Sequence, residues 1–242
     1  MNHVTHWGNA TRTQLSEALP ESLVVLPIGA IEQHGPYLPT RTDILISSHV
    51  AEAAAERAVE RGSVPIILAP PLPYGVSGYH RAYGGTLAIS IRTMLSVLED
   101  LIDSVEIQGG RRLLLVNGHG GNRGIARAAA SSADARDSIT IASVDYWDMG
   151  WDVGPGHAGN VEASLVLAIA PELVNTPIPQ RQNVPEVPSI GQTSYHGSWL
   201  WGSIDGYTDD PSEATAQKGN GFIETVVDGL ADLMVSFGKL PA

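Results

Sequence analysis

Residues 23–43 read LVVLPIGAIEQHGPYLPTRTD, and this is the most informative stretch of the chain. Its apolar start predicts a short buried parallel strand over Leu23–Ile28. The glycines and prolines that follow indicate a loop, from which Glu32 and His34 can project on the same face of an extended backbone. Asp43 ends the stretch where a helical pattern begins. Because carboxylates and imidazoles are ligands that divalent metals prefer, the stretch predicts a metal site beyond the end of a strand.

The rest of the chain alternates predicted strands with predicted helices, which is typical of a mostly parallel sheet covered by helices on both faces. The predicted strands are Leu23–Ile28, Val64–Leu68, Arg112–Val116 and Ile139–Val144. The predicted helices are Asp43–Arg61, Thr93–Ile107, Arg123–Ala135, Glu162–Ile169 and Gly221–Phe237. The segment Ala69–Gly85 is expected to be a loop, and Pro177–Asp210 is expected to be an irregular arm or lid. Both belong to one predicted domain that spans residues 1–242.

Composition limits the function more than the fold. The chain has 242 residues, 43% of them hydrophobic, which suffices for one α/β domain with a sizeable core. Its 14 basic and 26 acidic residues give a net charge of −12, so we expect neither nucleic acid nor a membrane as a partner. There are no cysteines, so any metal must be held by His, Asp and Glu. The polar start lacks the pattern of a secretory signal and no apolar run could span a bilayer, so we expect a cytoplasmic protein.

A second histidine lies in the glycine-rich segment NGHGGN at Asn117–Asn122. This segment directly follows the predicted strand Arg112–Val116. Because ligands of open α/β sheets bind beyond the carboxyl ends of the strands, His119 can meet Glu32 and His34 there. Two simpler interpretations stay open, namely a hydrogen-bonded loop histidine at His119 and a helix N-cap at Asp43. The segment lacks the Lys-Ser/Thr pair of a phosphate-binding P-loop, so we do not expect a nucleotide.

The third cluster is GPGHAGNVEAS at Gly154–Ser164, with His157 in a glycine loop and Glu162 entering a helix. A glutamate in the first turn of a helix often only complements the helix dipole. Here an almost wholly apolar run, Leu165–Ala170, follows and indicates that the helix is buried. A buried glutamate requires a partner, and a cation is a suitable one.

These three motifs, in this order and near these spacings, resemble the creatininase family of metal-dependent amidohydrolases. The resemblance covers about Leu23–Leu173 and extends more weakly into GYTDDPSEATAQKG at Gly206–Gly219. It implies a three-layer α/β/α sandwich with a mostly parallel central sheet. It also implies a binuclear site for two divalent metal ions (Zn2+, Mn2+ or Fe2+) and a homohexamer.

The resemblance also implies roles for individual residues. It assigns Glu32, His34, Asp43 and His119 as metal ligands, with Asp43 as the bridging carboxylate. Creatininase itself has a metal-binding glutamate where this chain has Gly121. The comparison with the wider family therefore assigns that ligand role to Glu162. The same difference argues against creatinine as the substrate. His157 matches the general acid/base of the family, and it forms the predicted catalytic pair with Glu162.

Substrate contacts are expected around the segment Tyr74–Thr86 and at the tryptophan that closes over the substrate in creatininase. The principal candidates are Ser77, His80, Gly120 and Trp147. Tyr79, Arg81 and Trp151 are further candidates.

The predicted function is hydrolysis of a carbon–nitrogen amide bond in a small linear or cyclic substrate by a metal-activated water. By this hypothesis His157 donates a proton to the departing nitrogen. Three alternatives stay open: a metallopeptidase of the same family, a ring-opening hydrolase of sugar or cyclitol catabolism, and a non-catalytic module that binds metal. The segment Pro177–Asp210 bears on the first alternative, because peptide cleavage requires an open groove.

Overall fold

The computed structural model describes residues 4–136, 138–150, 154–181 and 198–240. Its strands are β1 Val4–His6, β2 Leu23–Ile28, β3 Ile66–Leu68, β4 Arg112–Asn117 and β5 Thr140–Asp145. Its α-helices are α1 Arg12–Ala18, α2 Thr42–Glu60, α3 Ile91–Ile107, α4 Arg123–Ser131, α5 Asn160–Ile169, α6 Ser198–Ser203 and α7 Ala216–Gly238. Short 3-10 helices connect them: η1 Trp7–Asn9, η2 Leu19–Glu21, η3 Gly78–Tyr83, η4 Gly120–Asn122, η5 Ser132–Ala135, η6 Tyr146–Met149 and η7 Pro171–Leu173.

The strands form one parallel sheet in the order β1-β3-β2-β4-β5. In this register Ile28 pairs with Asn117, and Asn117 pairs with Asp145. The strands β2, β4 and β5 therefore end level with one another. The loops that leave these three ends start from the same edge of the sheet, which is where an α/β fold places its ligand site.

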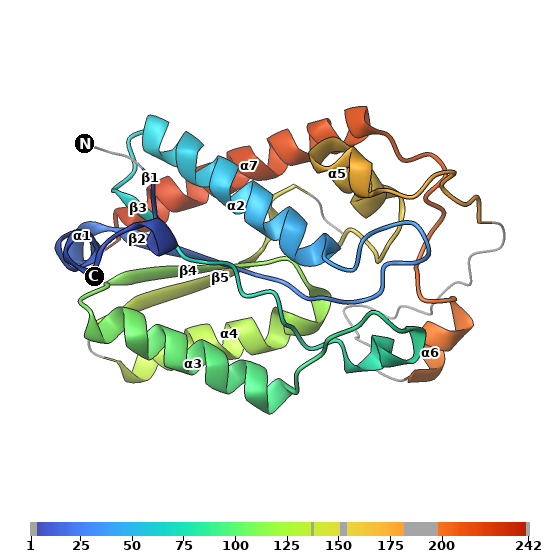
Figure 1. The fold of residues 1–242 in the computed structure, drawn as a ribbon. Coiled ribbons are helices and arrows are strands. Elements are labelled where there is room, and N and C mark those ends of the chain that lie inside the picture. The colour runs from blue at the N-terminus through green and yellow to red at the C-terminus, as the bar shows by residue number, and fades with distance from the viewer. Residues whose placement is uncertain (1–3, 137, 151–153, 182–197, 241–242) are drawn as a thin grey trace.

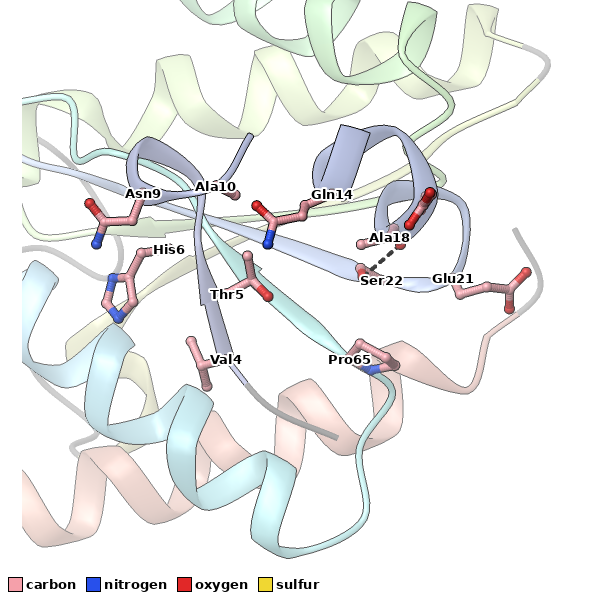
Figure 2. A pocket seen from close by; sticks show the side chains of 11 residues that line it. Val4, Thr5, His6, Asn9, Ala10, Gln14, Ala18, Glu21, Ser22 and Pro65 are labelled. Carbon is pink, nitrogen blue, oxygen red and sulfur yellow. Dashed lines mark hydrogen bonds between the residues drawn. The ribbon is translucent and has the colours of Figure 1, made fainter. Parts of the chain in front are cut away.

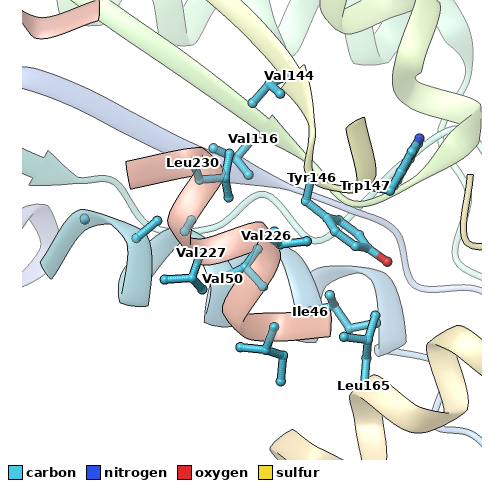
Figure 3. Packing of buried hydrophobic residues seen from close by; sticks show 14 of the residues in the cluster. Ile46, Val50, Val116, Val144, Tyr146, Trp147, Leu165, Val226, Val227 and Leu230 are labelled. Carbon is cyan, nitrogen blue, oxygen red and sulfur yellow. The ribbon is translucent and has the colours of Figure 1, made fainter. Parts of the chain in front are cut away.

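Helices cover both faces of the sheet, with α2, α5 and α7 on one side and α3 and α4 on the other (Figure 1). Successive residues of β2 alternate between the two faces: Leu23 and Val25 pack into one core, and Val24 and Leu26 pack into the other. Figure 3 shows the first core, in which apolar side chains of α7 and α2 meet those of β4 and β5. The expected three-layer α/β/α sandwich with a parallel central sheet is confirmed.

Several boundaries differ from the sequence prediction. β3 begins at Ile66 rather than Val64, beyond Pro65, which has no backbone N–H to donate to the sheet. α7 begins five residues earlier than predicted, because the Thr215 side chain accepts a hydrogen bond from the N–H of Lys218 and caps the helix. The prediction missed β1 and α1, which are short, and it missed α6, which lies in the segment expected to be irregular.

A hollow of about 570 Å³ lies beside the edge strand β1 (Figure 2). Ser22 and Pro65, which line it, precede β2 and β3, so this hollow is at the amino ends of those strands. None of the groups of metal-ligating atoms found among the described residues lies there.

Within the described parts of the chain, no helix combines the length and the apolar character needed to cross a membrane.

Candidate active site

A pocket of about 510 Å³ opens at the carboxyl ends of the central strands. Two glycines bring the start of α2 into it. A Cβ atom on Gly29, just after β2, would lie 2.7 Å from the backbone of Ile44, and a Cβ atom on Gly118, just after β4, would lie 2.5 Å from the carbonyl oxygen of Asp43. Both positions therefore require glycine for the first turn of α2 to rest on the strand ends, and this contact places Asp43 in the pocket.

Asp43 lies between the histidines of two different motifs. Its Oδ1 atom is 3.1 Å from Nε2 of His34, and its Oδ2 atom is 3.0 Å from Nδ1 of His119. Ligand atoms of Glu32, Asp43 and His119 converge in one group, and those of His34, Asp43 and Glu162 converge in a second. A third group combines Glu32, His34 and His157. The structure thus brings together all five predicted metal ligands, and it makes Asp43 common to two of the groups.

The helix-cap interpretation of Asp43 is wrong. α2 begins at Thr42 with Arg41 as its N-cap, so Asp43 lies inside the first turn. Its side chain is buried and faces the two histidines rather than the free N–H groups of the helix.

Hydrogen bonds on the outer ring nitrogens orient both of these histidines. Nδ1 of His34 lies 3.1 Å from the carbonyl oxygen of Glu32, and Nε2 of His119 lies 3.1 Å from that of Val76. The other nitrogen of each ring faces the carboxylates, and once its proton is lost it can bind a metal ion. The side-chain amide of Asn117 also binds the backbone of His119. Its Nδ2 donates to the carbonyl oxygen at 2.8 Å, and its Oδ1 accepts a hydrogen bond from the N–H at 3.1 Å. His119 is therefore a hydrogen-bonded loop histidine, and its Nδ1 also lies 3.3 Å from Oε1 of Glu32 and 3.0 Å from Oδ2 of Asp43.

The buried carboxylates and imidazoles shift one another's pKa values. Burial by itself would lower the pKa of His34, but the charges of Asp43 and Glu162 outweigh it and raise the pKa to about 10. The pKa of His119 is likewise raised, because Glu32 outweighs the effect of burial. Burial dominates at Glu162 and raises its pKa to about 8, against the attraction of His34. Protons on the imidazoles thus compensate the buried negative charge, which is the task that a bound cation would take over.

The donor atoms fit a divalent cation. Oε2 of Glu32, Nε2 of His34 and Oδ2 of Asp43 are buried and have no hydrogen-bond partner within the described residues. Buried polar atoms without a hydrogen bond are costly, and each of these three residues belongs to two of the groups of converging ligand atoms. Oxygen and imidazole nitrogen donors suit zinc, manganese or iron.

The loop that carries His157 is held by the segment after α6. Thr208 Oγ1 accepts a hydrogen bond from the His157 N–H at 2.7 Å, and Asp209 Oδ2 accepts one from the Asn160 N–H at 2.9 Å. His157 Nδ1 then lies 3.4 Å from Oε1 of Glu32. Burial and the charge of His34 lower the pKa of His157 to about 3, so its imidazole is neutral at pH 7.

The predicted substrate contacts fall into two groups. His80, Gly120 and Trp147 line the pocket, as does Tyr79. Ser77 is buried behind His119, with its Oγ 3.2 Å from Nε2 of that ring, and it does not line the pocket. Arg81 is exposed and donates to the carbonyl of Ala88. Trp151 lies outside the described residues. The substrate-binding roles stay predictions.

Sequence reasoning missed three residues of the site. Trp201 of α6 lines the pocket, and Nε2 of Gln33 lies 2.9 Å from a ring nitrogen of His80 and 3.0 Å from one of His157. Arg123 lines the rim, where its Nε lies 2.5 Å from Oδ2 of Asp145. Gln33 had a detectable signal, because it stands between two predicted ligands. Trp201 had none, since Trp199 and Trp201 lie in a segment expected to be irregular and belong to no motif.

The fold and the site together define an α/β/α hydrolase with metal-binding side chains at the carboxyl ends of its parallel strands. The family profile for creatinine amidohydrolase matches residues 8–234. The chain belongs to the creatininase family, and its relatives include hydrolases that act on carbon–nitrogen bonds.

Individual relatives bear this out. The mycofactocin precursor peptide peptidase of Mycobacterium tuberculosis is 33% identical over 91% of this chain and 87% of its own length. The creatinine amidohydrolase of Pseudomonas putida is 26% identical over 89% of each. A solved creatininase variant described as Zn–Zn type superposes with a TM-score of 0.81 over 99% of this chain and 100% of that one; at 23% identity it shows the fold alone.

Proposed function

We propose that this chain hydrolyses an amide carbon–nitrogen bond at a binuclear site for two divalent ions. The sharing of Asp43 between His34 and His119 carries the proposal, because it gives each ion its own imidazole and one common carboxylate. Glu32 would complete one ligand group, and Glu162 would complete the other. The Zn–Zn description of the solved relative supports two ions of this kind.

Bound divalent ions would supply a water of lowered pKa and polarise the amide carbonyl. His157 is the residue placed to move the proton. Its Nε2 donates to the carbonyl of Gln33 at 2.9 Å, which leaves Nδ1 bare and facing Glu32. A neutral imidazole in this position can accept a proton at Nδ1 and pass it to the departing nitrogen. The rings of Trp147 and Trp201, which both line the pocket, would restrict its water content.

Creatinine is not the expected substrate. A Cβ atom on Gly121 would lie 2.5 Å from Nε2 of His119 and 2.3 Å from the carbonyl oxygen of Val76. The glutamate that creatininase carries at this position therefore has no room in the present backbone, and Glu162 takes its place in the ligand group.

Peptide cleavage is the second candidate. The peptide peptidase from Mycobacterium tuberculosis is 33% identical to this chain, against 26% for creatinine amidohydrolase. The glycines Gly118, Gly120, Gly121, Gly154 and Gly156 all line the pocket, and a backbone without side chains can lie beside a bound peptide.

For both candidate functions, amide hydrolysis and peptide cleavage, we propose that the arm at Pro177–Asp210 belongs to the single domain. It would border the pocket through Trp201.

The test begins with metal analysis of protein purified without chelator, followed by assays on linear amides, lactams including creatinine, cyclitol derivatives and short peptides. Glu32→Ala and His119→Ala should each lower kcat/KM by at least ~10³-fold, since one ligand group is lost. His6→Ala, at an exposed site on β1, is the matched control and should change nothing. Full activity in a chelator, or in either ligand variant, would overturn the proposal. Creatinine as the best substrate would refute the argument from Gly121.

The homohexamer and the cytoplasmic location stay predictions. Light scattering on the purified protein tests the first, and fractionation of the source cells tests the second.

A further inference from the structure

The side-chain amide of Gln33 can adopt only one orientation. Its Oε1 accepts a hydrogen bond from the N–H of Gly35 at 3.0 Å, and its Nε2 donates to the carbonyl of Gly206 at 2.6 Å. Exchanging the two ends would set donor against donor and acceptor against acceptor at these buried contacts. One hydrogen on Nε2 therefore forms the hydrogen bond to the carbonyl of Gly206, and the second can be donated to a neighbouring ring nitrogen.

Two ring nitrogens lie within reach of that hydrogen: Nδ1 of His80 at 2.9 Å and Nε2 of His157 at 3.0 Å. Nε2 of His157 is also 2.9 Å from the backbone carbonyl oxygen of Gln33, and only a protonated nitrogen can donate to it. With that nitrogen protonated, the amide hydrogen goes to Nδ1 of His80, which must then be bare. A neutral His80 consequently carries its proton on Nε2.

The ring of His80 is held in one place. It packs against the rings of Tyr79, His157 and Trp201, with centroid distances of 4.6, 4.4 and 4.3 Å. Its Nε2 is buried, lies 3.7 Å from Oε1 of Glu32, and has no hydrogen-bond partner within the described residues. Since His80 lines the pocket, a buried N–H without a partner at this point indicates a ligand that accepts from it.

We propose that Nε2–H of His80 donates a hydrogen bond to the carbonyl oxygen of a carboxamide substrate, and that Gln33 is the positioning residue that fixes this tautomer. The inference rests on the proposed function and deepens it. Negative charge grows on the carbonyl oxygen as the amide is attacked, and a preoriented donor stabilises that charge more than it stabilises the ground state. His80 thus becomes a catalytic residue, distinct from the proton-transferring His157.

The first arm of the test observes the tautomer directly. Long-range 1H–15N correlation spectra of histidine-labelled protein distinguish a protonated from a bare ring nitrogen, and the spectrum of His80→Phe assigns the signal. We expect the proton on Nε2, both in the chelator-treated and in the zinc-loaded protein. Gln33→Met removes the donor with little change in volume and should release this preference, whereas Gln33→Glu should move the proton to Nδ1. A wild-type His80 with its proton on Nδ1 would overturn the inference.

The second arm measures binding without turnover, by calorimetry of acetohydroxamic acid with the zinc-loaded protein. His80→Phe should weaken its affinity by about tenfold, the usual effect of one lost hydrogen bond of this kind. His80→Gln carries an N–H near the position of Nε2 and should retain affinity, while His80→Asn reaches only the position of Nδ1 and should not. Equal affinity in all three variants would overturn the inference, provided that their zinc contents match.

Failure of the inference and failure of the proposed function are separable. If the wild type hydrolyses no amide, the proposed function fails, while the tautomer and the hydroxamate affinities still decide the role of His80. If the wild type hydrolyses amides and His80→Phe keeps both kcat and hydroxamate affinity, only the inference fails.

Discussion

His34 and Asp43 face each other across 3.1 Å, from Nε2 to Oδ1, with both side chains buried. The imidazole comes from the loop after β2, and the carboxylate comes from the first turn of the helix that ends this loop. The second oxygen of Asp43 remains available for His119 after β4. One side chain therefore joins loops from two strands, and its loss should affect the whole centre rather than one ligand position.

Asp43→Asn should empty the metal site. The amide keeps the shape of the side chain but removes the negative charge and one acceptor oxygen. We expect metal affinity to fall by more than the ~10–100-fold that the loss of an outer hydrogen-bond partner costs. Metal analysis by mass spectrometry after dialysis measures this, with Asp100→Asn on the exposed side of α3 as the control. Unchanged metal content in Asp43→Asn would exclude Asp43 as a shared ligand.

Metal binding should release protons and strengthen as the pH rises. In the metal-free protein the pKa of His34 is raised to about 10 and that of Glu162 to about 8, so both groups are largely protonated at pH 7. A metal must displace these protons, and the competition weakens as the pH passes through each pKa. Calorimetry in buffers of different ionisation enthalpy should show proton release at pH 7 and an apparent affinity that rises from pH 6 to pH 9. A pH-independent affinity would contradict the shifted pKa values.

Gly120→Ala and Gly121→Ala form a matched pair. A Cβ atom on Gly120 meets no atom within 4 Å, whereas one on Gly121 would approach Val76, His119 and Tyr79 at 2.3 to 2.8 Å. Gly121→Ala should therefore displace His119 and lower the zinc content, and the strain of overpacking should cost about 1–3 kcal/mol of stability. Gly120→Ala should keep its stability and its zinc, and any change should appear in KM because it lines the pocket. Equal behaviour of the two variants in urea denaturation and metal analysis would refute this assignment.

The strands β2, β3 and β4 could be predicted from the sequence because each is a nearly continuous apolar run beside a glycine or a proline. Leu23–Ile28 was predicted with its observed bounds, and Arg112–Val116 differed from β4 by one residue. β1 could not be predicted, since three residues at an edge carry no periodicity. Its pairing with β3 depends on a partner more than 60 residues away in the sequence, and local patterns contain no information about such a partner.

The site could be predicted as far as the ligands lie directly after strands. Glu32, His34 and His119 met that condition, and the structure brings them together with Asp43 and Glu162. The role of Gln33 could not be predicted, because its partners His80, His157 and Gly206 are 47 to 173 residues away in the sequence. Ser77 was predicted as a substrate contact, and its role stays a prediction; in the structure its Oγ lies 3.2 Å from Nε2 of His119, and Ser77 is not among the residues that line the pocket.

Tyr37→Phe should destabilise the loop that carries His157. The Tyr37 hydroxyl donates to the carbonyl of Ala158, and the N–H of Ala158 donates to Oε2 of Glu162 at 2.5 Å. Ala158 has a φ of +49°, a conformation that costs an alanine energy and that these two hydrogen bonds hold in place. Without the hydroxyl, the buried carbonyl loses its donor, which should lower the free energy of unfolding by about 1–3 kcal/mol. Urea denaturation measures this, and Tyr74→Phe at a 45% exposed tyrosine is the control. Equal midpoints for the two variants would show that the hydroxyl of Tyr37 contributes nothing to the loop.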